Sequence, residues 1–457
     1  MSLNSPVYFI TALVLCLLLS MPVYLNGQVL EPSSSELSPP GIYWSQVETV
    51  VEIGLRDNPE ILGFRVMESV SLARFSQTRL FPNPVFGFEW ERKRGGTDGE
   101  RRLSIEIPLP VDGRREAAMG TAKASTDEVR HEIADRERLL RQRIRDSVTT
   151  VVAERMKYAL LLESLRLAER NQALVAESVE QGLRAPLELN KESVFVNGIR
   201  ARLEIAQADV SEAESFLATL LGRDSLVGID LPTSLPGVGY ENQKLTGNAE
   251  EFLGRRPDVL ASQARNQMAE GLLREARAEG RPTFELMFGI TEMKSGFPLR
   301  GLNSNGEFFP IEDRMRFAGV GLKIGIPIFN RNQGNISAAA GSVESSRLMT
   351  SFVERQARNE LGVATTRVSR SNRSLELMSK GVIDQARDNF RVMGLSYQEG
   401  AISLDEFLRE RRTLIDLELE FIESAQMNAI AESALMASTG VMARCEITAT
   451  CKSGGDK

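Results

Sequence analysis

The chain has 457 residues, charged side chains at 26% of its positions and a formal net charge of −7 at pH 7. This acidic balance disfavours a nucleic-acid partner. An aromatic content of 6%, with one His and two Trp, is low for the core of a compact enzyme and fits long amphipathic helices better. Since no combination of nucleophile, base and cofactor ligands is recognisable, we expect no enzyme activity, no cofactor and no resident metal.

Residues 1–27 have the features of a signal peptide. The apolar run from Tyr8 to Leu19 is shorter than the roughly 20 apolar residues of a spanning helix. No Lys or Arg precedes this run, although signal peptides usually begin with one, and Cys16 lacks the small neighbours of a lipoprotein site. We therefore predict an exported protein, with an irregular leader at 28–42 marked by Pro39 and Pro40.

The rest of the chain is a tandem duplication, predicted as repeats at 43–230 and 247–441 with a linker at 231–246 and a tail at 442–457. A unit this long implies two equivalent halves rather than a solenoid. Cys445 and Cys451 in the tail could close a small disulfide loop. The paired motifs, in the same order in both halves, are Asn58-Pro59 with Arg256-Pro257, Phe81-Pro82-Asn83-Pro84 with Arg281-Pro282, 103–113 with 322–330, 180–188 with 398–406, and Leu221-Gly222 with Thr439-Gly440.

Each repeat begins with helical periodicity and then changes to a period of two. In the first repeat, a helix at 43–79, interrupted at Asn58-Pro59, precedes strands at about 84–92 and 101–110. In the second repeat, alternation predicts strands at about 283–292 and 315–327, joined by a loop at about 293–314. Each strand has one apolar face and one polar or small face.

A very long helix follows each strand pair, at about 115–181 and 334–399. Apolar residues recur at spacings of three, four and seven among many Arg and Glu side chains, which is typical of coiled coils. About 65 residues at 1.5 Å each give a rod of roughly 100 Å. Each rod ends at a glycine, Gly182 or Gly400, and a shorter helix then returns at 186–221 or 404–439.

Four strands cannot close a barrel, and an open sheet in lipid would leave edge amides unpaired. We therefore expect three chains to close a twelve-stranded barrel around a lumen. The predicted lipid-facing residues are Phe86, Phe88, Trp90, Leu103, Ile105, Leu286, Phe288, Val320 and Leu322, and the predicted lumen-facing charged residues are Glu89, Glu91, Glu106, Glu285 and Lys323. A soluble sandwich has the same alternation, but two hairpins have little core and no partner sheet in this chain.

The order of helix, strand pair, long helix, glycine turn and short helix, given twice, resembles the TolC-like outer membrane efflux proteins, or outer membrane factors. Three motifs carry the resemblance: 81–84 before the first strand, 107–115 after the second, and 400–408 at the helical turn. The entry motif, short leader and Gly-Arg-Arg exit are most similar to the heavy-metal cation branch of the family.

The resemblance implies a mainly helical trimer with a β-barrel in the outer membrane of a Gram-negative bacterium and a helical coiled-coil tunnel in the periplasm. Such proteins are passive exit ducts of tripartite efflux systems, which implies a periplasmic adaptor (membrane fusion protein), an inner-membrane pump of the RND type, surrounding outer-membrane lipid, and heavy-metal cations as the cargo. In the family, the adaptor docks at the helical turns. These turns correspond here to Gly182, Leu183, Arg184 and Ala185, and to Gly400, Ala401, Ile402 and Ser403.

Family members also place carboxylates inside the tunnel beyond the turn. Asp405 and Glu406 match the first such position, Glu188 is the repeat equivalent of Glu406, and Arg409 replaces the second acidic position. A ring of these carboxylates would favour cations, whereas Arg409 weakens that expectation and a solvated helix face is the alternative. Two other functions stay open: a duct of the same fold for drug efflux or type I protein secretion, and a pore-free periplasmic coiled-coil scaffold or adaptor.

Overall fold

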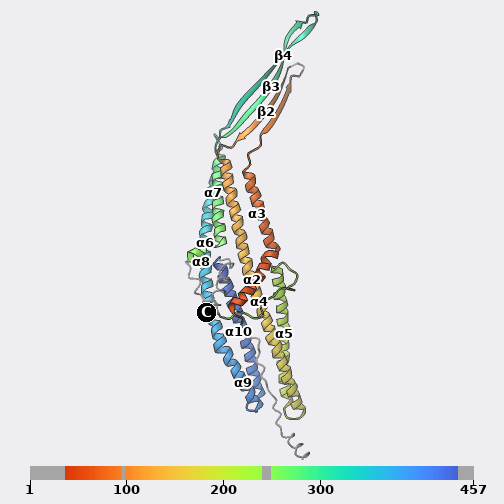
Figure 1. Cartoon of the computed structure of the whole chain (residues 1–457), viewed down its shortest axis with the longest axis vertical. Coiled ribbons are helices and arrows are strands. Elements are labelled where there is room, and N and C mark those ends of the chain that lie inside the picture. Colours follow the sequence, from red (N-terminus) through yellow and green to blue (C-terminus); the bar gives the residue numbers. More distant parts are fainter. Residues whose placement is uncertain (1–36, 95–97, 239–248, 441–457) are drawn as a thin grey trace, which may run out of the picture.

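The computed structural model describes residues 37–94, 98–238 and 249–440, and it is a long helical body with a β-sheet at one end (Figure 1). The predicted signal peptide with Cys16, most of the predicted leader, and the tail with Cys445 and Cys451 lie outside the described residues. Within the described ranges, no helix is both long and apolar enough to cross a membrane.

The first half of the chain forms the predicted elements in the predicted order. Helices α2 (Pro40–Asp57) and α3 (Pro59–Thr78) are followed by strands β1 (Val85–Arg92) and β2 (Gly99–Leu109). Helix α4 (Arg114–Glu180) has 67 residues and therefore extends about 100 Å. Helix α5 (Pro186–Leu220) returns beside it.

The second half repeats this order with one difference in the rod. Helices α6 (Ala249–Arg255) and α7 (Pro257–Glu279) precede strands β3 (Thr283–Leu302) and β4 (Phe308–Gly325). The second rod consists of α8 (Gln333–Leu377), the π-helical segment η3 (Met378–Ile383) and α9 (Asp384–Gln398), and α10 (Leu404–Ser438) returns from it.

The π-helical segment corrects the expectation of an unbroken α-helix at 334–399. Leu375 and Ile383 are eight residues apart and would point about 80° apart around an ideal α-helix. The wider π turn takes up one extra residue. Both side chains are consequently buried in the same core cluster, with exposed fractions of 0% and 2%.

The second hairpin is longer than its alternation suggests, which corrects the predicted loop at 293–314. Backbone pairing continues beyond Thr291 opposite Phe317 to Leu302 opposite Phe308, across one irregularity between Gly296 and Arg300. The side-chain pattern changes in this stretch from apolar to charged, so periodicity alone loses the strand, while the backbone amides remain paired.

One antiparallel sheet joins the two repeats, with strand order β1-β2-β3-β4. The hairpins meet along β2 and β3, where Gly99 lies opposite Lys294 and Leu109 opposite Phe284. The outer edges of β1 and β4 therefore have no neighbour within the described chain.

The main core lies in the middle of the helical body, where α2 crosses α4 and α10 (Figure 1). The hydroxyl groups of Tyr43 and Thr149 form a hydrogen bond of 2.8 Å, and the Nε1 of Trp44 donates to the carboxyl group of Glu432 at 3.0 Å. The second contact ties the first described helix to the last one. A smaller cluster around Phe195 and Phe407 holds the end of the body that is distant from the sheet.

The duplicated Asn58-Pro59 and Arg256-Pro257 motifs occupy equivalent joints. Asn58 caps α3 and donates to the backbone oxygen of Leu220 at 2.8 Å. Arg256 precedes α7 and donates to the backbone oxygen of Ser438 at 3.3 Å. Each joint therefore fastens a helix break to the end of the returning helix of its own repeat.

Candidate functional site

The strand register divides the sheet side chains into two sets on opposite faces. Phe86 lies opposite Ile105, Ile105 opposite Phe288, and Phe288 opposite Val320. Paired residues share a face and alternate residues along a strand share it too. All nine residues predicted to face lipid thus lie on one face of the sheet, and all five charged residues predicted to face the lumen lie on the other.

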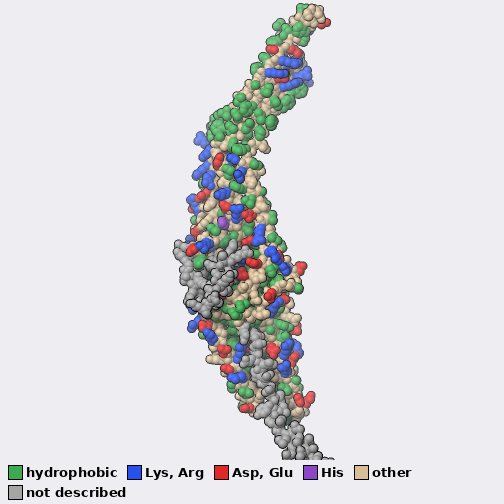
Figure 2. Space-filling view, in the orientation of Figure 1, with side chains coloured by type: hydrophobic (Ala, Val, Ile, Leu, Met, Phe, Trp, Pro, Cys, Tyr) green, Lys and Arg blue, Asp and Glu red, His purple; other side chains and the backbone are tan. Residues whose placement is uncertain are grey.

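The apolar face is continuous and uncovered. Its side chains form four rows across the strands, and Figure 2 shows an apolar band where the sheet meets the helical body. Phe86, Phe88 and Val320 are 70–72% exposed, which is unusual for a contiguous apolar surface of a soluble protein. The rows contain Leu109, Phe284 and Ile324; Ile107, Leu286 and Leu322; Phe86, Ile105, Phe288 and Val320; and Phe88, Leu103, Ile290 and Ala318.

The polar face carries paired charges. Lys323 lies 2.8 Å from Glu285 and 3.5 Å from Glu106, and these three residues come from three different strands. Gly319, Gly321 and Gly325 lie on the same face of β4 as Lys323, so this face has both small and charged side chains. Such a surface can line a water-filled space.

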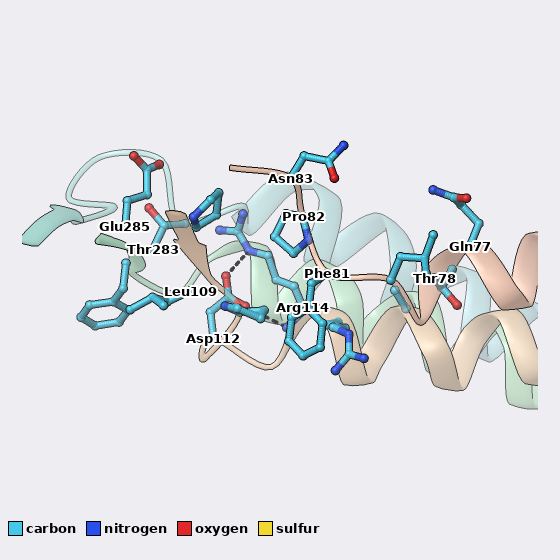
Figure 3. Close-up of a pocket in the computed structure, with 16 residues that line it drawn as sticks. Gln77, Thr78, Phe81, Pro82, Asn83, Leu109, Asp112, Arg114, Thr283 and Glu285 are labelled. Atoms are coloured by element: carbon cyan, nitrogen blue, oxygen red, sulfur yellow. Dashed lines mark hydrogen bonds and ion pairs between the residues drawn. The ribbon is translucent and has the colours of Figure 1, made fainter. Parts of the chain in front are cut away.

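The sheet and the helices meet at an open cavity of about 810 Å³ (Figure 3). Asp112 forms an ion pair with Arg114 at 3.0 Å, and its backbone oxygen accepts from Arg281 of the other repeat at 3.0 Å. The guanidinium of Arg115 lies 4.2 Å from the ring centroid of Phe81. The motifs that the sequence singled out at 81–84 and 107–115 thus come together and fix the direction in which the strands leave the helices.

The two predicted turns lie at the opposite end of the body and have the same backbone. Gly182 and Gly400 both have φ of 73°, in the left-handed region. In each turn the next residue donates back to the rod, Leu183 to Ser178 at 2.9 Å and Ala401 to Ser396 at 2.8 Å. This pattern is a Schellman motif, which favours glycine because other residues strain at this φ.

The three candidate tunnel carboxylates all have partners within the chain. Glu406 forms a capping box with Ser403, accepting from the Ser403 amide at 2.9 Å, and this bond lowers the pKa of Glu406. Asp405 contacts Lys191 at 3.3 Å and Arg409 at 3.2 Å, and its pKa is lowered by Lys191 first. Glu188 pairs with Arg184 at 3.2 Å. Asp405 and Glu188 are therefore paired with cations of this chain, whereas Glu406 keeps its charge and is held by the uncharged donors of Ser403.

Helices α4 and α5 form a helical hairpin in the first repeat, and α9 and α10 form one in the second. Contacts between these two helical hairpins hold the turns beside each other. Arg184, in the first turn, donates to the hydroxyl of Tyr397, at the end of the second rod. Further along, Arg202 pairs with Asp416 at 2.7 Å. Leu183 and Leu187 remain 74% and 63% exposed beside these contacts. The first turn and the start of α5 thus expose two leucines beside contacts that join the two repeats.

Sequence reasoning missed several buried charged groups. Glu432 is fully buried, and this burial raises its pKa to about 7. Arg411 is 4% exposed, and its guanidinium lies over the ring of Phe195. Burial lowers the pKa of Arg411 to about 10 despite its attraction to Glu192, and burial also raises the pKa of Glu192. Their helices are rich in charge throughout, so no local signal separates them from solvated neighbours.

Comparison with known proteins agrees with this geometry. The cobalt-zinc-cadmium resistance protein CzcC of Cupriavidus metallidurans is 22% identical over 76% of this chain and 78% of its own length. The pyoverdine export outer membrane protein OpmQ of Pseudomonas putida is 24% identical over 81% of this chain and 80% of its own length. The crystal structure of CusC superposes with a TM-score of 0.71 at 20% identity, covering 86% of this chain and 92% of CusC.

The likeness to CusC extends across both repeats, because its coverage exceeds the length of either half. The family match itself falls on residues 248–441, which is close to the predicted second repeat. The chain therefore carries an outer membrane efflux protein domain in its second half and, across both halves, has the fold of the TolC-like outer membrane efflux channels.

Proposed function

We propose that three copies of this chain form an outer-membrane exit duct. The observation that carries the proposal is a four-stranded sheet with a continuous apolar face and two unpaired edges. In lipid, unpaired backbone amides cost several kcal/mol each, so a stable sheet has to close. Because β1 and β4 are antiparallel across the sheet, β4 of one copy can pair with β1 of the next.

In the closed barrel the apolar rows face lipid, and Glu89, Glu91, Glu106, Glu285 and Lys323 face the lumen. The helical rods of three copies continue this lumen as a tunnel of about 100 Å, which is the length of α4. Substrate passes through it without any chemical step. This proposal locates the sheet in the outer membrane and the helical body in the periplasm.

The turns at Gly182 and Gly400 are the proposed docking surface for a periplasmic adaptor, which in turn connects to an inner-membrane pump of the RND type. Two observations support this assignment. The turns form the end of the body farthest from the sheet (Figure 1), and Leu183 in the first turn and Leu187 at the start of α5 are exposed beside the contact between Arg184 and Tyr397. An adaptor can bury these apolar side chains without ordering the turns first.

The proposed cargo is heavy-metal cations. The support comes from the relatives, since CzcC is named for cobalt, zinc and cadmium resistance. A second candidate is an organic compound such as a siderophore, because OpmQ, which matches over a similar length, is named for pyoverdine export. Metal content separates the two: a deletion strain challenged with zinc, cobalt and copper should retain one of them selectively, and unchanged metal content would favour the organic cargo.

The barrel is tested by two neighbouring substitutions on opposite faces. Leu286→Arg places a charge on the apolar face, at a cost of roughly 2–4 kcal/mol near the bilayer midplane, and trimers should not accumulate in the outer membrane. Glu285→Arg, the matched control, should assemble and change the ion selectivity of reconstituted channels. Equal assembly of both variants, measured in outer-membrane fractions, would refute the barrel.

The docking surface is tested by Gly400→Pro. Proline cannot adopt the φ of 73° and cannot donate the bond from Gly400 to Tyr397. We expect export to be lost while trimer levels remain unchanged, with Gly400→Ala giving a partial loss. Wild-type export by the proline variant would contradict docking at this turn.

A further inference from the structure

The apolar face ends in a belt of basic side chains at the end of the band away from the helices. The row after Phe88 contains Trp90, Arg101, Glu292 and Arg316, paired across the four strands. The following row contains Arg92, Lys294 and Arg314. Figure 2 shows Lys and Arg gathered on the sheet beyond the apolar band.

The belt has surplus positive charge. Lys294 is matched by Glu312 at 2.7 Å, whereas Glu292 approaches Arg316 only to 3.8 Å. Within the described ranges, Arg101 has no carboxylate partner. The four arginines of the two rows thus face one remaining carboxylate.

On the polar face, at the same position along the strands, the arginine is paired with carboxylates. Arg102, the next residue after Arg101, lies 3.0 Å from Glu89 and 2.7 Å from Glu100. Two carboxylates therefore form ion pairs with one guanidinium on the polar face. The excess of unneutralised arginine belongs to the face that carries the apolar band.

The position of the belt corresponds to a membrane interface. From the row of Phe284 to the row of Ile290, the apolar band extends about 20 Å along the strand, and the bacterial outer membrane is thinner than average. Trp90 is 62% exposed at the edge of the band, and tryptophan is enriched at the depth of lipid headgroups.

We propose that this belt, centred on Arg101 and Arg316, binds the phosphate groups of lipids in the outer leaflet. Planar guanidinium groups bind phosphate oxygens through two parallel hydrogen bonds, and clustered Arg and Lys beside an apolar surface attract anionic lipid. The belt holds the barrel at a fixed depth, because moving it in either direction separates the arginines from the phosphates. This inference rests on the proposed outer-membrane barrel.

The test is a titration of the purified trimer in detergent micelles with diphosphorylated lipid A and with the same lipid after removal of its phosphates. Trp90 is exposed and reports binding by fluorescence, while Trp44 is 3% exposed and contributes a nearly constant signal. At about 1 kcal/mol for each arginine, Arg101→Gln/Arg316→Gln should weaken binding of the phosphorylated lipid about 30-fold.

The control, Arg102→Gln/Lys323→Gln, removes the same charge from the polar face and should retain wild-type affinity. Equal affinity of the wild-type trimer for both lipids would refute the belt, and so would an equal loss in the two double variants. If wild-type trimers are present in the outer membrane, either result overturns this inference alone. Absence of such trimers overturns the proposed duct and the belt together.

Discussion

Glu432 provides a quantitative test of the helical core. Its carboxyl is completely buried, accepts from Trp44 at 3.0 Å, and has a pKa of about 7 against an ordinary value of 4.5. Between these two pH values the unfolded chain releases the proton and the folded chain keeps it. Folding stability therefore falls as pH rises from 4.5 to 7 and is constant on either side of this window.

The size of the effect follows from the shift. A difference of about 2.5 units at 1.36 kcal/mol each gives a loss of about 3 kcal/mol across the window. Glu432→Gln keeps the shape of the protonated side chain and an oxygen for Trp44. We expect the variant to equal the wild type at pH 4.5 and to exceed it by about 3 kcal/mol at pH 8.

The assay is denaturant unfolding at pH 4.5 and pH 8, followed by circular dichroism. Glu423→Gln is the matched control, because Glu423 is on the same helix with its side chain 50% exposed. The control should change stability by less than about 0.5 kcal/mol at both pH values. A Glu432→Gln variant that is less stable than the wild type at pH 8 would refute the reasoning, since it would mean that the buried carboxylate is favourably compensated.

Four other substitutions probe the joints and turns. Arg256→Ala should destabilise the chain by about 2–4 kcal/mol, because Asp258 and Glu360 lose a shared buried partner. Asn58→Ala should cost about 1–2 kcal/mol, because it removes a helix cap. Denaturant unfolding compares the two variants. Gly182→Ala should cost about 1–2 kcal/mol from its φ of 73° alone, since a Cβ there meets no atom within 4 Å, and a cost near zero would contradict the turn geometry. Tyr397→Phe should speed amide hydrogen exchange around Arg184 without altering exchange near the sheet, and unchanged exchange would show that their bond does not tie the hairpins.

Local chemistry explains which elements were predictable from sequence. The break at Asn58-Pro59 and the glycine turns depend on residues whose backbone preferences act at one position, so they could be located directly. The strand faces followed from alternation and agree with the observed register. The distal part of the second β-hairpin, β3–β4, was missed because Lys294, Glu312 and Arg314 interrupt the apolar alternation while the backbone continues to pair.

Long-range contacts account for what could not be predicted. The π turn at 378–383 exists because Leu375 and Ile383 reach a common core, a requirement that nothing in the local sequence states. The carboxylates at the turns were considered as tunnel groups, but their partners lie on another helix, as with Lys191 and Asp405, or in a cap, as with Ser403 and Glu406. Spacing along one helix does not show which cation approaches from the next.

The two turns have the same backbone but are stabilised differently, and this asymmetry has a consequence for docking. In the second turn, Ser403 and Glu406 satisfy the start of the returning helix with their own side chains. The first turn has Ala185 at that position, with no side-chain cap, and Arg184 reaches across to Tyr397 instead. The first turn thus has a contact with the second repeat in place of a side-chain cap, whereas the second turn has its own cap in addition to the contact between Asp405 and Lys191. A partner that separates the two repeats at this end should therefore loosen the turn at Gly182 more than the turn at Gly400.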